Sequence, residues 1–174
     1  MKALVRGVAV LLGGLVLVLS GCAVDYAPKP SPSRSGVLVL TLSEAKTTAQ
    51  AIELELSALV PSPLVAAIAQ TSRGSLLDCA SGGSHWSGHT RVDFIGPIDT
   101  AQVLEAGARA WNARGEPWHA SVEDIVEADL MLVVRGPGDS QYLMSTSSDK
   151  TYAHIDSFAP CVEVQPGEVR GPFY

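Results

Sequence analysis

The chain has 174 residues, of which 47% are hydrophobic and 17% charged, and its formal net charge is −6. This length and apolar content suit one domain with its own hydrophobic core, together with terminal segments. The acidic balance argues against nucleic-acid binding, because a protein that neutralises phosphates needs a basic surface.

The first 21 residues are predicted to be a lipoprotein signal peptide. Lys2 and Arg6 precede the apolar run VAVLLGGLVLVL at 8–19, which has signal-peptide length and is short for a bilayer span. Leu19-Ser-Gly-Cys22 then resembles the bacterial lipobox, in which small residues precede a cysteine that is lipidated and becomes the new N-terminus. The alternatives are an ordinary secretory signal and a signal anchor.

Lipid on Cys22 would hold the protein at the extracytoplasmic face of the cell membrane. Each buried methylene contributes about 0.8 kcal/mol, so two or three acyl chains anchor effectively permanently. Removing residues 1–21, which carry two basic and no acidic side chains, takes the net charge from −6 to −8. The protein is therefore expected to attach to the membrane through its lipid and not through basic side chains.

Residues 22–36 are predicted to be a flexible tether, because their sequence, CAVDYAPKPSPSRSG, is rich in proline and serine and has no apolar period. We expect a single extracytoplasmic domain over residues 37–164. The segment 165–174 contains Pro166, Gly167, Gly171 and Pro172, and is predicted to be a poorly ordered tail.

A helical unit is predicted over 37–70. Thr41-Leu-Ser-Glu44 has the spacing of a capping box. Apolar residues then recur every three or four positions and form one face: Ala45, Ala49, Ile52, Leu56 and Leu59. The polar residues expected away from this face are Lys46, Glu53 and Glu55. Pro61 and Pro63 end the helix, and the following LVAAIAQ is predicted to be a short second helix.

After a loop at 76–90, alternation of polar and apolar residues predicts a strand over 90–95. Asp99 is placed to cap a helix over 100–114, with an inner face formed by Val103, Leu104, Gly107 and Trp111. Four further strands are predicted over 118–125, 129–135, 140–146 and 151–157, with turns at 136–139 and 147–150. This order favours an α+β fold, with an antiparallel sheet of four or five strands and helices packed on one face.

The two cysteines of the domain are expected to form a disulfide. With Cys22 used by lipid, Cys79 and Cys161 remain, in a compartment where disulfides persist. Their bridge would close a loop of about 82 residues, which the chain-entropy model values at roughly 4–5 kcal/mol.

The stretch LLDCASGGSHWSGHT at 76–90 also contains candidate metal ligands. His85 and His89 have the i, i+4 spacing of histidine pairs that share one zinc ion on a helix, with His119, His154 or a carboxylate as a third ligand. The surrounding glycines argue against a helix, and Cys161 competes for Cys79. Solvated loop histidines are the simpler interpretation, and we expect no metal and no cofactor.

Other catalytic constellations are weaker. A cysteine nucleophile beside a histidine would have to stay reduced in an oxidising compartment, and no G-x-S-x-G motif is present. Gly136-Pro-Gly138 does not open a helix and so is not a phosphate cradle. Paired-carboxylate catalysis stays an alternative for an acidic cluster around one turn, although the cluster lacks the calcium-loop pattern and is most simply a solvated edge; its members are Glu123, Asp124, Glu127 and Asp129.

Of the three tryptophans, Trp111 and Trp118 are expected in the core. Trp86 lies among glycines and is left with two interpretations. It either packs over the Cys79–Cys161 bridge, or it faces a ligand together with His85 and His89.

Four motifs in this order resemble the small cell-envelope lipoproteins of actinobacteria, most of which have no known function: Leu76-Leu-Asp-Cys79, Trp86-Ser-Gly88, Trp111-Asn-Ala-Arg-Gly115 and Ser157-Phe-Ala-Pro-Cys161. The resemblance spans residues 43–161 and implies a lipid-anchored extracytoplasmic domain with one cysteine pair. It supplies no catalytic residues. We therefore expect a non-catalytic module that binds an envelope protein or a small ligand. The alternative is a hydrolase of envelope polymers, metal-assisted through His85 and His89.

Overall fold

The computed structural model describes residues 39–125, 129–169 and 173–174. The signal peptide, Cys22, the tether and Glu127 lie outside the described residues. The elements in chain order are α1 (Leu42–Ser57), a 3-10 turn (Ser62–Leu64), β1 (Val65–Gln70), β2 (Ser75–Asp78), β3 (Ser84–Phe94), α2 (Thr100–Asn112), β4 (His119–Asp124), β5 (Leu130–Arg135), β6 (Gln141–Thr146) and β7 (Tyr152–Phe158).

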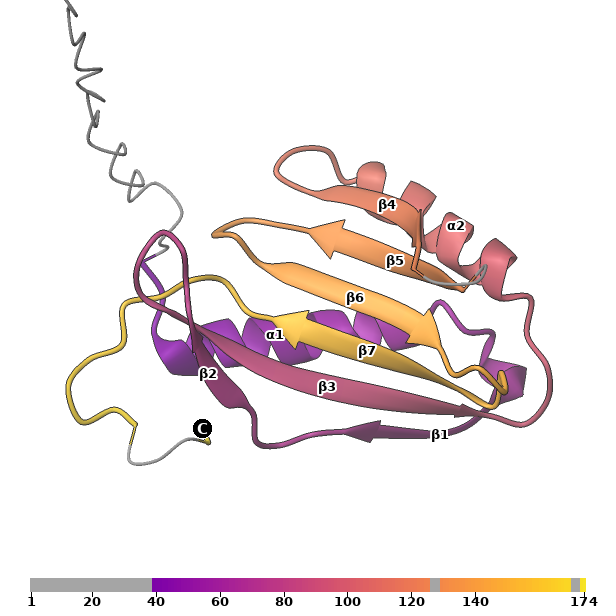
Figure 1. Cartoon of the computed structure of the whole chain (residues 1–174), viewed down its shortest axis with the longest axis horizontal. Helices are drawn as coiled ribbons and strands as arrows, with labels where there is room; N and C mark the ends of the chain where they lie inside the picture. Colours follow the sequence, from indigo (N-terminus) through magenta and orange to yellow (C-terminus); the bar gives the residue numbers. More distant parts are fainter. Residues whose placement is uncertain (1–38, 126–128, 170–172) are drawn as a thin grey trace, which may run out of the picture. The chain divides into compact units, whose positions relative to one another are not determined.

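The described strands form one antiparallel sheet in the order β1-β3-β7-β6-β5-β4, and β2 pairs with the first part of β3 (Figure 1). The predicted α+β class with an antiparallel sheet is confirmed. The expected number of strands was too low, since the sheet has seven. The four consecutive strands from β4 to β7 correspond to the four predicted in that part of the chain.

Local sequence signals placed both helices correctly. Thr41 and Glu44 form the predicted capping box at the start of α1. Asp99 accepts a hydrogen bond from the backbone N–H of Gln102, at 3.0 Å, and caps α2. The buried residues of α2 are those predicted, namely Val103, Leu104, Gly107 and Trp111.

The segment predicted as a second helix is instead strand β1. It pairs antiparallel with β3, from Val65 opposite Phe94 to Gln70 opposite Thr90. Seven residues are too few to distinguish the helical period from the strand period. The alanines of the segment have a high intrinsic helix propensity, which decides the prediction when tertiary contacts are not known. Pairing with an adjacent strand outweighs that local preference.

The predicted loop at 76–90 is instead a hairpin. β2 and β3 pair from Ser75 opposite Ser87 to Asp78 opposite Ser84, and the chain reverses through Gly82 and Gly83. Both glycines have positive φ, +91° and +81°, which other residues rarely adopt. The glycines therefore indicated a turn between strands.

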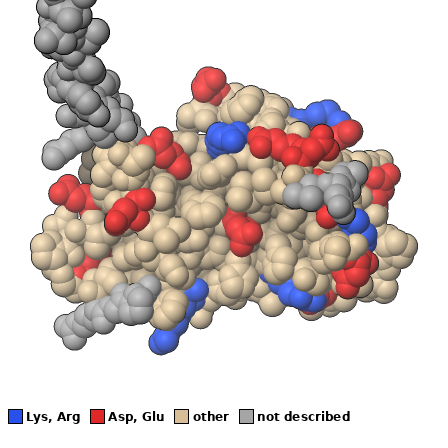
Figure 2. Space-filling model, in the orientation of Figure 1, with Lys and Arg blue, Asp and Glu red and all other residues tan. Residues whose placement is uncertain are grey.

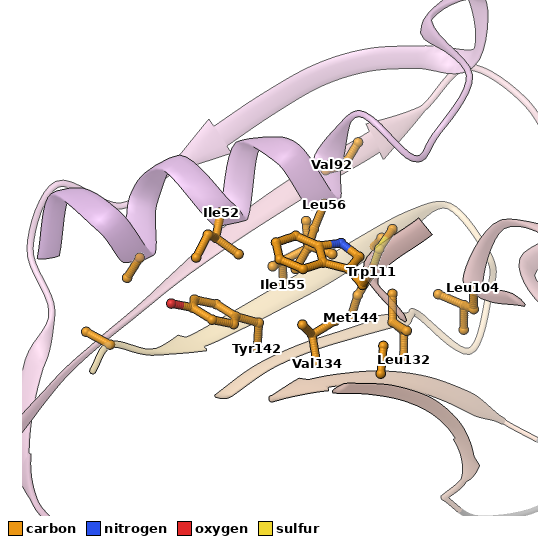
Figure 3. Packing of buried hydrophobic residues seen from close by; sticks show 14 of the residues in the cluster. Ile52, Leu56, Val92, Leu104, Trp111, Leu132, Val134, Tyr142, Met144 and Ile155 are labelled. Carbon is orange, nitrogen blue, oxygen red and sulfur yellow. The ribbon is translucent and has the colours of Figure 1, made fainter. Parts of the chain in front are cut away.

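Both helices pack on one face of the sheet, over a continuous hydrophobic core (Figure 3). α1 lies behind β3 and β7 in Figure 1, and α2 packs on β4 and β5. A Cβ on Gly107 of α2 would come within 2.6 Å of Leu59, which follows α1. The ends of the helices are also joined by an ion pair between Glu55 and Arg114. The opposite face of the sheet carries no helix among the described residues.

The segment 165–174, expected to be a poorly ordered tail, makes backbone contacts with the domain where it is described. Phe173 pairs with Ser75, and Gly74 and Tyr174 exchange two backbone hydrogen bonds of 3.0 and 2.9 Å. These bonds extend the sheet beyond β2, a long-range pairing that the local composition does not reveal. Within the described part of the chain, no helix has both the length and the apolar character to cross a membrane.

Candidate functional site

The disulfide between Cys79 and Cys161 is present, as predicted, and joins residues 82 positions apart. Cys79 begins the turn of the β2–β3 hairpin, where its N–H donates to the carbonyl of Gly83 and its own carbonyl accepts from Gly82. Cys161 is fully buried, whereas Cys79 is half-buried. The bridge therefore ties a hairpin turn to the segment that follows β7.

Backbone hydrogen bonds hold the same two segments together independently of the sulfur atoms. Ser84 and Val162 exchange bonds of 2.9 and 3.1 Å, and the N–H of Cys161 donates to the carbonyl of Gly138 at 2.7 Å. A Cβ on Gly83 would lie 2.4 Å from the carbonyl oxygen of Val162, so this close approach needs a glycine.

His85 lies beside the disulfide. Its Nδ1–H donates to the carbonyl of Ala159 at 2.7 Å, and both ring nitrogens are 3.8 Å from Cys161 Sγ. The ring also meets Phe158 edge to face, with ring centres 6.4 Å apart. Of the three residues proposed from the sequence to face a ligand, namely His85, Trp86 and His89, only His85 lies against the disulfide.

Trp86 points to the opposite side of β3 and has no exposed surface. Its indole packs against Gly74 and Gly88, and its Nε1–H donates to the carbonyl of Tyr174 at 3.0 Å. Lys46 Nζ lies 5.6 Å from the centre of the indole ring. The structure therefore places Trp86 in the core beneath α1, and it is not a ligand-facing residue.

The strand geometry separates the histidines that the sequence offered as ligands of one metal ion. His85 and His89 are four residues apart on β3, which corresponds to about 13 Å along a strand. His119 starts β4, at the far edge of the sheet, about 19 Å from β3 at the usual strand spacing. The i, i+4 zinc pair, the less favoured interpretation of these histidines, is therefore ruled out, because one ion needs both nitrogens within about 2 Å.

His89 is exposed and lies directly opposite Asp156 of β7. His154 faces Arg91 one row further along, which makes it a diagonal neighbour of His89 at roughly 7–8 Å. Arg91 in turn stacks over Tyr152, 3.5 Å from the ring centre, and pairs with Asp93. These contacts organise the polar side of β3 and β7.

These residues belong to the sheet side without helices, which we call the open face: the outward side chains of β3, β7, β6 and β5. One row of paired residues crosses its middle, namely His89, Asp156, Leu143 and Val133. Val133 is 1% exposed although none of the described helices covers this face. Figure 2 shows this face as mostly uncharged, with one acidic side chain near its middle and most of its charged side chains toward its margins.

Among the pockets formed by described residues, two shallow ones flank the sheet. One, of about 280 Å³, lies at the turn between β5 and β6 and is lined by Arg135, Gly136, Asp139, Ser140 and Gln141. The other, of about 320 Å³, is formed by 94–97 and 149–151. In the predicted acidic cluster, Glu123 pairs with Arg135, and Asp129 pairs with Lys150. Two described members of the cluster, Glu123 and Asp129, therefore have their charge neutralised by a basic side chain.

The buried carboxylate of Glu53 is a feature that sequence reasoning missed, since it was expected away from the apolar face of α1. Glu53 has no exposed surface and accepts hydrogen bonds from Gln70, Thr90 and Ser157, which lie on β1, β3 and β7. From the sequence alone, a charged residue outside the apolar face of a helix is expected to be exposed to solvent. Its partners come from three distant strands, so no local signal reveals them.

Comparisons with family models, with curated proteins and with solved structures found no match for the chain.

Proposed function

We propose that this protein is a membrane-anchored extracytoplasmic lipoprotein whose domain is a non-catalytic binding module for an envelope protein. The observation that carries the proposal is the open face, a sheet surface that no helix among the described residues covers. It is mostly uncharged apart from the exposed Asp156 and has most of its charged side chains at its margin. The anchoring part rests on the lipobox-like sequence ending at Cys22 and on the proline- and serine-rich tether.

The composition of the open face supports a protein partner. Its partly exposed apolar side chains are Leu143 in the middle row and Phe158 and Met131 on the neighbouring rows, whereas Val133 beside Leu143 is buried. Charged side chains lie at its borders, with Arg91 and Asp93 on one side and Arg135 on the other. A central region with few charges, surrounded by a polar rim, is typical of protein–protein interfaces.

The tether supports the same proposal. A Pro- and Ser-rich segment of this kind is semi-extended, at up to about 3 Å per residue. It would allow the domain to reach a partner tens of ångströms from the bilayer surface.

Site-directed photo-crosslinking in the cells that make the protein tests this function. A photoreactive amino acid at Leu143, in the middle of the open face, is expected to give a discrete protein adduct. The same amino acid at Thr48, an exposed residue on α1, is the matched control and is expected to give none. Ser145→Arg places a charge beside Leu143 on this face and is expected to abolish the adduct.

Equal adducts from positions 143 and 48, or none from 143, would contradict a partner at the open face. An adduct that survives Ser145→Arg would do the same. Circular dichroism of the Ser145→Arg protein checks that its fold is unchanged.

A further inference from the structure

The corner that contains the disulfide also holds three metal-ligating groups. One ligand atom from each of Cys79, His85 and Cys161 lies within 4.8 Å of the others. Cys161 Sγ is 3.8 Å from each ring nitrogen of His85. In a tetrahedral zinc site, with Zn–S near 2.3 Å and Zn–N near 2.0 Å, neighbouring ligand atoms are about 3.5–3.8 Å apart. His85 and Cys161 therefore already have the separation of two zinc ligands.

The surroundings of His85 suit a ligand. Its Nδ1–H donates to the carbonyl of Ala159, which leaves the Nε2 lone pair free and fixes the tautomer. Ligating histidines are usually held by such a second hydrogen bond. Ser81 Oγ lies 3.6 Å from Cys161 Sγ and 3.2 Å from an oxygen of Asp139, so its hydroxyl can donate to a thiolate at that position.

The frame that carries these groups does not depend on the disulfide alone. The two Ser84–Val162 bonds, the bond from Cys161 to Gly138 and the bond from Cys79 to Gly83 all involve backbone atoms. After reduction, these bonds would keep both sulfur atoms near the imidazole. Only the two sulfur atoms must then separate, which rotation of the half-buried Cys79 side chain allows.

We propose that reduction of the disulfide converts this corner into a site for a soft divalent cation of the zinc type, held by Cys79, Cys161 and His85. A dithiol reductant transfers two electrons and two protons to the bridge and itself becomes a disulfide, leaving two thiols. The cation then displaces both thiol protons and binds two thiolates and one neutral imidazole. Three protein ligands leave the fourth tetrahedral position open.

The same corner thus has two mutually exclusive states. In the oxidised state it is a covalent staple without ligand capacity, because both sulfur atoms are used in the bridge. In the reduced state the cation joins the same segments. This inference does not depend on what binds the open face.

The test uses the untagged full chain purified in detergent, with Co²⁺ as a spectroscopic probe and Zn²⁺ as competitor. After treatment with a phosphine reductant, the protein is expected to bind one equivalent of Co²⁺ with thiolate charge-transfer absorption. The oxidised protein is expected to show none. His85→Ala should weaken binding by at least about tenfold, as ligand-sphere changes commonly do.

His89→Ala is the matched control, because His89 lies on the same strand and the same face but outside the cluster. It is expected to bind Co²⁺ as the wild type does. Equal binding by oxidised and reduced protein, or equal affinity in His85→Ala, would overturn the proposal. If reduction unfolds the chain, Zn²⁺ should restore its circular dichroism in the wild type but not in His85→Ala; failure to restore it would also overturn the proposal.

Discussion

At the level of single residues, the buried Glu53 links α1 to three strands. Its carboxylate accepts from Gln70, Thr90 and Ser157, and the last two are fully buried. A buried donor without an acceptor costs about 1–3 kcal/mol, and more when its partner was charged. This one side chain therefore joins α1 to β1, β3 and β7 through hydrogen bonds, in addition to the apolar packing of the helix.

We expect Glu53→Ala to lower the free energy of unfolding by about 3 kcal/mol, because it leaves several buried donors unpaired. Glu55→Ala on the same helix removes a surface pair with Arg114 and should cost less than about 1 kcal/mol. Urea denaturation of both variants measures the difference. Equal losses would show that the buried hydrogen bonds contribute nothing beyond a surface ion pair.

Tyr142 provides a second residue-level prediction, which concerns pH. Burial raises the pKa of Tyr142 from 10.0 to about 12, and the nearby Glu53 carboxylate adds to the rise. The unfolded chain therefore ionises first as pH increases. The raised pKa of Tyr142 in the folded state therefore stabilises the protein by about 3 kcal/mol below pH 10. This stabilisation is lost as the pH rises toward about 12.

Between about pH 9 and about pH 11, wild-type protein is expected to lose about 1 kcal/mol more stability than Tyr142→Phe. The Tyr142 hydroxyl is buried and has no hydrogen-bond partner among the described residues, so its removal should cost little at neutral pH. Urea denaturation of both proteins at the two pH values is the measurement. Parallel losses in the two proteins would contradict the assigned pKa.

At the level of elements, the glycines of the β2–β3 hairpin explain why the sequence looked like a loop. Gly88 lies in the middle of β3, where a Cβ would meet the Trp86 ring at 2.1 Å. Gly74 is constrained in the same way, by the indole and by the carbonyl of Ser87. Glycine within a strand often marks such a close approach. The strand therefore keeps its pairing, and the missing side chains make room for tryptophan.

Gly88→Ala is expected to destabilise the protein by about 1–3 kcal/mol, the range for overpacking a core. Gly96→Ala is the control, since a Cβ there meets nothing within 4 Å, and it should stay within about 0.5 kcal/mol of wild type. Thermal and urea unfolding give both values. A harmless Gly88→Ala would mean that the indole does not need the glycine surface.

At the level of the whole molecule, lipid anchoring through Cys22 and folding of the domain are predicted to be independent of each other. Cys22 lies outside the described residues, and the disulfide uses the other two cysteines of the chain. Cys22→Ser is therefore expected to abolish lipid modification and membrane retention without changing the melting temperature. Mass spectrometry of the N-terminal peptide and cell fractionation measure this. Acylation that persists in the variant would contradict the lipobox interpretation.

Sequence reasoning succeeded where the signal is local. The capping box at Thr41, the cap at Asp99 and the inner face of α2 depend on residues three or four positions apart. The cysteine pair followed from the number of cysteines and the expected compartment. The antiparallel α+β class followed from the order of the elements.

Only the tertiary structure could decide features whose partners are distant in the sequence. β1 is a strand because β3 lies beside it, and Glu53 is buried because three strands supply its donors. His85 and His89 lie far apart because the hairpin extends the chain between them, and Tyr174 is ordered because it pairs with Gly74. The sequence alone determines local periodicity and capping. Strand pairing and burial depend on contacts across the fold, where local propensity is outweighed.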